Sequence, residues 1–175
     1  KKSVKEGMEV SGEVFVNFKD LRDDPIDGDQ YFQKIDTAGD PQWGEGVRLD
    51  PVDDIDFSAR FTANTLGGVS VIWERGTFPD VDIFFQNLTS DGNYSLVEPL
   101  AISNNLGYQF SPILSGDEQN GMYAIYADQG SGSINLMVQK LSANFEPEWG
   151  ETGLVAMNGL DGDVNLSLIH ISEPT

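Results

Sequence analysis

The sequence predicts an all-β fold made of three similar units, and two observations carry this prediction. First, the segments QYFQKI, IFFQNL and LMVQKL place Gln33, Gln86 and Gln139 at a constant spacing of 53 residues, which indicates an internal repeat. Second, apolar residues occupy consecutive positions in these segments, although neighbouring residues of a strand point to opposite faces of a sheet. Sheets that are apolar on both faces must be covered on both. We therefore expect a β-propeller fragment of about three four-stranded antiparallel blades, with an incomplete ring.

Each unit contains short stretches of strand character separated by turn residues. We expect strands at 13–18, 30–36 and 47–50 in the first unit, at 57–62, 69–74, 82–89 and 94–102 in the second, and at 110–115, 122–128, 134–142 and 153–157 in the third. The expected boundaries are 1–11 for the end of a preceding blade or a linker, 12–56 for a blade whose first strand is partial or missing, 57–109 and 110–160 for two further blades, and 161–165 for the start of the next.

The last ten residues need a separate interpretation. Residues 166–175 read LSLIHISEPT and resemble the in-frame translation of an adapter used to prepare sequencing libraries. We interpret this tail as a sequencing scar and exclude it from fold reasoning. We then expect that the natural chain was interrupted near Asn165, that the lone His170 is foreign to it, and that the sequence is an internal fragment of a longer protein.

Composition narrows the possible partners. The chain has no cysteine, so disulfides and thiolate metal sites are excluded. Its 29 acidic and 10 basic side chains give a net charge of −19, which disfavours nucleic acid and anionic membranes as partners. No apolar run is long enough for membrane insertion.

A wider pattern surrounds the repeated glutamines. The segments GGVSVIWERG and DVDIFFQNLTSDGNYS, with their counterparts in the other units, resemble the repeats of bacterial secreted or cell-surface β-propeller proteins. Those repeats combine a Trp-containing strand, a strand of the type DIYxQ, and the turn residues DxG and WG. The resemblance implies an extracellular or cell-surface location, with a signal sequence outside this chain. It also implies that further blades of the same chain, and a protein or carbohydrate at the cell surface, are the partners.

Acidic loops provide the only metal-site candidates. The turn between the second and third strands and the connection between blades should meet on one rim, and both are rich in aspartate. Carboxylate oxygens in such numbers suit calcium, although the spacing is not that of an EF-hand. The alternative is a solvated acidic rim without a specific ion. The candidate calcium ligands are Asp23, Asp27, Asp29, Asp53, Asp54 and Asp56; no other cofactor is expected.

The repeated glutamines and tryptophans have structural as well as functional interpretations. Mid-strand glutamines between apolar residues are expected to be structural amides that bond to neighbouring strands or blades. Trp43 and Trp149 lie two repeat lengths apart and are expected to anchor blade packing rather than to stack on sugars. In the middle unit, Leu96 replaces them, which departs from the pattern.

The sequence favours a function without catalysis. It has no cysteine and only His170, so neither a Cys/His nor a Ser/His/Asp arrangement can form. We expect no enzymatic activity and predict a non-catalytic binding or scaffold module with an unknown ligand. Two alternatives stay open: a propeller glycoside hydrolase or lyase acting on extracellular polysaccharide through a carboxylate pair, and a calcium-stabilised structural repeat.

Overall fold

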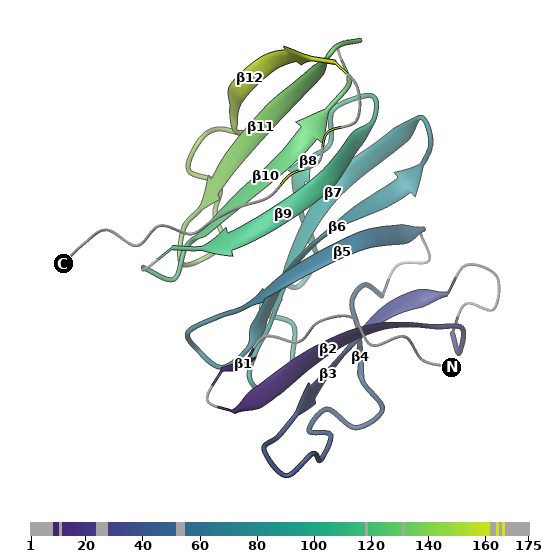
Figure 1. Ribbon diagram of the computed structural model, residues 1–175, viewed down its shortest axis with the longest axis vertical. Helices are drawn as coiled ribbons and strands as arrows, with labels where there is room; N and C mark the ends of the chain where they lie inside the picture. The colour runs from purple at the N-terminus through teal and green to yellow at the C-terminus, as the bar shows by residue number, and fades with distance from the viewer. Residues whose placement is uncertain are drawn as a thin grey trace.

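The computed structural model describes residues 9–10, 12–23, 28–51, 55–117, 119–130, 132–161, 164 and 166. Within these residues all regular structure is β, in three four-stranded antiparallel sheets. Each sheet is formed by strands that are consecutive in sequence, and the three sheets are stacked on one another (Figure 1). The predicted all-β fold with three four-stranded antiparallel blades is thus confirmed, and the stack does not close into a ring.

The first sheet contains β1 (Glu9–Val10), β2 (Glu13–Asp20), β3 (Asp29–Ile35) and β4 (Val47–Arg48). The second contains β5 (Asp56–Ala63), β6 (Val69–Thr77), β7 (Asp80–Leu88) and β8 (Leu100–Ser103). The third contains β9 (Gln109–Gly116), β10 (Met122–Asp128), β11 (Ile134–Leu141) and β12 (Leu154–Leu160). The order within each sheet is the order in sequence, so all neighbours are joined by simple hairpin connections.

The repeat unit is reproduced in strand register. In the central hairpins, Val14 pairs with Ile35, Val69 with Leu88, and Met122 with Leu141. At the other ends of the hairpins, Phe18 pairs with Tyr31, Trp73 with Phe84, and Tyr126 with Met137. Phe18, Trp73 and Tyr126 are therefore equivalent positions, and the two additional residues of the first unit lie in its β2–β3 loop.

The fourth strands differ from the expected boundaries. The sequence predicts one strand over 94–102, but β8 begins only at Leu100, and Tyr94 makes only an isolated bridge to Leu88. The backbone between them turns away from the ladder because the side chain of Gln86 bonds to both the N–H and the carbonyl of Leu96. The same holds in the first sheet, where β4 covers two residues rather than the predicted 47–50. A short strand, Glu9–Val10, pairs with β2 ahead of the expected first unit.

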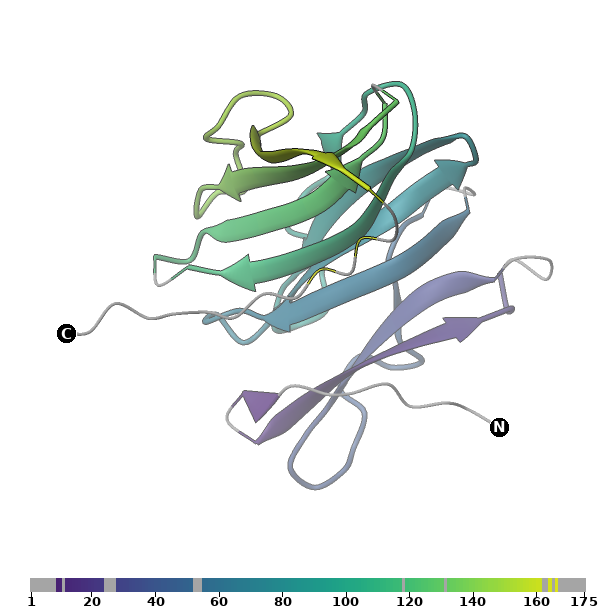
Figure 2. The same ribbon diagram turned by 45° about the horizontal axis from the view of Figure 1, so that its top comes forward.

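The second sheet is buried on both faces, as its consecutive apolar residues predict. Val71 and Trp73 pack toward the first sheet, in a cluster with Phe15 and Phe32. Ile72 faces the other way and packs with residues of the third sheet. We call the face of each sheet that points to the next sheet its front, and the opposite face its back. Figure 2 shows the second sheet between its two neighbours.

No helix in the part of the chain described is long and apolar enough to cross a membrane.

Candidate functional site

The repeated glutamines form the same clamp in every sheet. The Oε1 atom of Gln33 accepts hydrogen bonds from the backbone N–H of Trp43, at 2.8 Å, and of Lys34, at 2.9 Å. Its Nε2 atom donates to the carbonyl of Gly44 at 2.8 Å. Gln86 bonds in the same way to Leu96 and Asn87. Gln139 bonds to Trp149, Gly150 and Lys140. The amides are structural, as predicted, but they bond to the loop that follows their own strand and not to a neighbouring strand or blade.

Each clamp fixes a long loop between the third and fourth strands. These three loops cover residues 36–46, 89–99 and 142–153. Their backbone hydrogen bonds also repeat: the N–H groups of Gln42, Ser95 and Glu148 each donate to a third-strand carbonyl at 2.8 Å. Because turns alternate between the two ends of an antiparallel sheet, the three loops emerge at the same end of their sheets. The sequence thus builds three similar, rigid loops on one rim.

Trp43 joins the first sheet to the second, as the packing-anchor interpretation predicts. Its side chain is 7% exposed, and its Nε1 donates to the carbonyl of Ser90 at 3.1 Å. The ring lies directly above Gly92, where a Cβ atom would come within 2.9 Å of the indole. At the second interface Leu96 takes the place of the tryptophan, and the ring of Phe145 packs against Phe85 with centroids 5.2 Å apart.

Three of the six predicted calcium ligands have clear partners at the opposite rim. Asp29 is buried and forms an ion pair of 2.8 Å with Arg48. Asp56 is buried and accepts a hydrogen bond of 2.8 Å from Trp73 Nε1. Asp23 is exposed and accepts from the hydroxyl of Tyr31. The other three candidates, Asp27, Asp53 and Asp54, lie outside the described residues.

Around these aspartates, the described residues contain no group of three His, Cys, Asp or Glu side chains that could hold a metal ion. The contacts of Asp29 and Asp56 instead connect strands within their sheets. Calcium binding by the acidic loops stays a prediction.

Arg75 is a partly buried cation that sequence reasoning passed over, because it occupies an unmatched position in the repeat. It forms an ion pair with the fully buried carboxylate of Asp50, and its guanidinium lies 3.8 Å from the ring centroid of Phe84. Burial lowers the pKa of Arg75. The strand register pairs Arg75 with Asp56 at the start of β5, a partnership that the repeat pattern does not indicate.

Asp82 is a described carboxyl group with an altered acidity. Burial, and then the neighbouring charge of Asp80, raise its pKa to about 6, while Arg75 lowers it in part. Its Oδ1 atom is buried without a hydrogen-bond partner among the described residues. A carboxyl group with a pKa near neutrality can act as a general acid.

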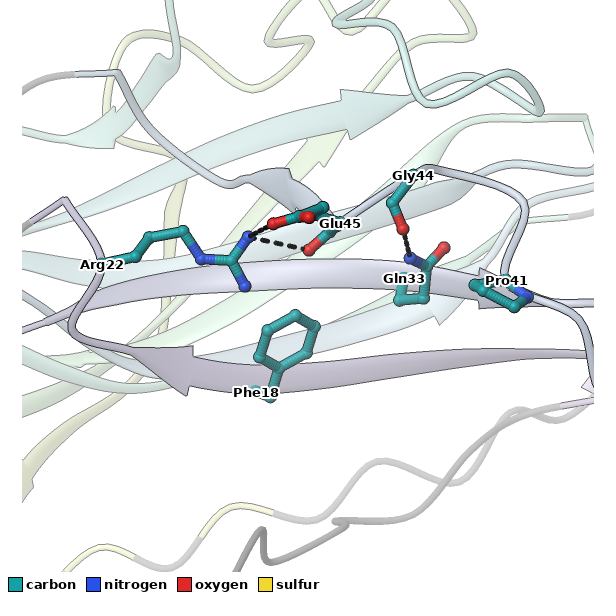
Figure 3. Close-up of a pocket in the computed structure, with 6 residues that line it drawn as sticks. All are labelled: Phe18, Arg22, Gln33, Pro41, Gly44 and Glu45. Atoms are coloured by element: carbon teal, nitrogen blue, oxygen red, sulfur yellow. Dashed lines mark hydrogen bonds and ion pairs between the residues drawn. The ribbon is translucent and has the colours of Figure 1, made fainter.

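A pocket of about 340 Å³ lies on the back of the first sheet (Figure 3). Arg22 crosses it and donates from Nη1 to the carbonyl of Glu45 at 3.0 Å. The guanidinium also lies 4.5 Å from the ring centroid of Tyr31. The opposite wall is the clamp of Gln33 and Gly44, and the ring of Phe18 forms the floor. Phe18 is equivalent to Trp73 of the second sheet. Trp73 lies on the back of its sheet and is covered by the first sheet, whereas the back of the first sheet carries the pocket.

Comparison with known proteins gives a distant structural likeness. No known family profile and no curated protein matches the sequence. Among solved structures, the fold is similar to the endo-arabinase from Bacteroides thetaiotaomicron, with 11% sequence identity and a TM-score of 0.46. The match covers 84% of this chain and 61% of the arabinase, so the chain spans about three fifths of that protein's length.

Proposed function

We propose that this chain is a non-catalytic binding or scaffold module of an exported bacterial β-propeller protein. One observation carries the proposal: the same buried glutamine clamp fixes the loops 36–46, 89–99 and 142–153 in all three sheets. The exposed residues of these loops differ between units, with Pro41, Tyr94 and Pro147 at one equivalent position. Rigid, similarly placed loops with variable side chains suit a binding surface. Because such loops are already ordered in the free protein, binding a ligand costs less conformational entropy.

The surface of these loops supports one choice of ligand class. The loops expose both apolar and polar groups, among them Val97, which is 95% exposed, and Glu45. The net charge of −19 opposes polyanions. A protein or a neutral carbohydrate at the bacterial cell surface therefore suits these loops best. The loops, and not the paired carboxylates of the opposite rim, are the proposed contact surface.

A binding experiment tests this function. The immobilised chain is presented with a panel of neutral bacterial and plant polysaccharides and with an extract of outer-membrane proteins. We expect one class to bind. We also expect Val97→Asp and Glu45→Lys to weaken binding at least about tenfold, the scale of a binding hot spot, without changing the melting temperature. The exposed Leu106→Ser, in the β8–β9 connection at the opposite rim, is the matched control. Binding that survives both loop substitutions would refute the proposed surface.

The raised pKa of Asp82 favours one second candidate, a part of a propeller glycoside hydrolase or lyase. Retaining and inverting glycosidases both need a protonated carboxyl group near a second carboxylate, and Asp80 is the neighbour that raises the pKa of Asp82. Release of reducing ends from a polysaccharide, abolished by Asp82→Asn, would favour this candidate over the binding module. Binding without any product would favour the module.

A further inference from the structure

The front of the third sheet repeats the front of the first. In the first sheet the rings of Phe15 and Trp43 pack with centroids 5.5 Å apart and an interplanar angle of 44°. At the equivalent positions of the third sheet, Tyr123 and Trp149 pack with centroids 5.9 Å apart and an angle of 48°. The first pair is buried under the second sheet, whereas the second pair is only half-buried. The third sheet thus presents the same aromatic pair without a described sheet over it.

The fourth strand of the third sheet extends this apolar front. Leu154 and Met157 of β12 pair with front-facing positions of β11 and are 53% and 55% exposed. In the second sheet the corresponding part of β8 is covered, and Ile102 is only 1% exposed. The indole Nε1 of Trp149 has no acceptor among the described residues, whereas that of Trp43 bonds to the carbonyl of Ser90.

The back of the first sheet repeats the back of the second. Under Trp43, the second sheet offers two valines of β6, a leucine at the end of β7, and a glycine in the following loop. The strand register identifies the same four positions on the first sheet. The valines and the glycine are identical there, and isoleucine replaces leucine; all four residues are half-buried or exposed. The equivalent pairs are Val14 and Val69, Val16 and Val71, Ile35 and Leu88, and Gly39 and Gly92.

The glycine makes this match specific. Gly92 leaves room for Trp43, because a Cβ atom there would come within 2.9 Å of the indole. Gly39 has open space above its Cα atom. The back of the third sheet is different, because it has Phe145 at the equivalent position and faces Leu96. Of the two interfaces between described sheets, only the first has a tryptophan over a glycine. The same two residue types lie on the outer faces of the stack, with Trp149 on the front of the third sheet and Gly39 on the back of the first.

We propose that two copies of this chain associate head to tail, the front of each third sheet packing on the back of the partner's first sheet. The contact would reproduce the interface between the first and second sheets, with Trp149 over Gly39. Such an interface is heterologous, so it either closes into a ring or continues as a filament. Propellers contain four to eight blades, and two stacks of the three described sheets would give six. The expected assembly is a closed dimer of six sheets.

The test measures mass in solution. Light scattering after size exclusion is recorded at several concentrations in about 0.5 M salt, which screens the repulsion between two chains of charge −19. We expect twice the 19.2 kDa mass of one chain, without growth to larger species. Trp149→Ala should raise the dissociation constant at least about tenfold, the loss typical of a buried aromatic anchor. Leu66→Ser, on an exposed residue of the β5–β6 turn, is the matched control and should leave the dimer intact.

A mixing experiment separates a lost interface from a lost fold. Trp149→Ala damages only the front, and Val16→Arg damages only the back. Each variant alone should be monomeric with an unchanged circular dichroism spectrum, while an equimolar mixture should form a heterodimer through the one intact pair of faces. A monomeric parent chain, a filament that grows with concentration, or variants that do not complement each other would overturn the proposal. A monomer that still binds a cell-surface ligand would overturn this inference alone and leave the proposed function standing.

Discussion

Replacing Gly92 with alanine should destabilise the contact between the first two sheets more than the same change at the equivalent Gly39. Both glycines have left-handed backbones, with φ of 80° and 89°, so alanine costs each about 1 to 2 kcal/mol in conformation. At Gly92 the new Cβ would also lie 2.9 Å from the ring of Trp43. That ring cannot withdraw, because Gln33 holds its backbone and Ser90 holds its Nε1. Overpacking adds about 1 to 3 kcal/mol, for a total of about 2 to 5.

Urea unfolding followed by tryptophan fluorescence provides the assay. Both variants are made in the Trp149→Ala background, so that no indole of a second copy lies over Gly39. We expect the difference in unfolding free energy between Gly92→Ala and Gly39→Ala to be about 1 to 3 kcal/mol, the overpacking share. In a Trp43→Leu background that difference should vanish, because leucine leaves space for the Cβ. Equal costs at the two glycines would refute the packing argument.

Three further predictions follow from the clamps and the acidic rim. Gln86→Met should lower the unfolding free energy by about 2 to 4 kcal/mol, since buried backbone groups of the loop lose their partners; a loss below 0.5 kcal/mol in urea, about the size of a neutral surface change, would contradict the clamp. Burial raises the pKa of Asp82 from 3.8 to about 6, so the folded state binds this proton more tightly and loses stability as the pH rises through that window. The melting temperature of Asp82→Asn minus that of the parent should therefore increase between pH 4 and pH 7. A difference that stays constant over this range would contradict the prediction. The calcium hypothesis predicts that millimolar calcium raises the melting temperature and that Asp53→Asn with Asp54→Asn removes the rise, which calorimetry would show; an equal rise in the double variant would exclude these two ligands.

The repeat made the architecture predictable. A constant spacing with apolar residues on both faces of a strand can be satisfied only by sheets stacked between neighbours, and the register of the second and third sheets follows it residue by residue. The structural role of the glutamines was equally predictable from the sequence, since a polar side chain buried mid-strand needs hydrogen-bond partners. Where the prediction was wrong, at 94–102, a side chain competes with the ladder for the backbone. The spacing of apolar residues does not indicate that the Gln86 side chain will bond to the backbone of Leu96 in place of a neighbouring strand.

The candidate site was less predictable, because its contacts join distant parts of the chain. The pattern of aspartates indicated an acidic rim, but it did not indicate that Asp29 pairs with Arg48 or that Asp56 accepts from Trp73. Such pairings depend on the twist of each sheet and on which rotamers reach across it. The altered acidity of Asp82 has the same origin, since it results from burial beside Asp80 and Arg75.

Departures from the repeat are compensated across an interface rather than within a unit. Leu96 breaks the tryptophan pattern of the second sheet, and Phe145 breaks the glycine pattern of the third, at a φ of 64° that costs about 1 to 2 kcal/mol. Their side chains meet at the same interface, where the ring of Phe145 packs against Phe85 and fills the volume that a tryptophan occupies at the first interface. The volume of each position is therefore set by the facing sheet. By the same rule, the residue that covers Trp149 should be a glycine.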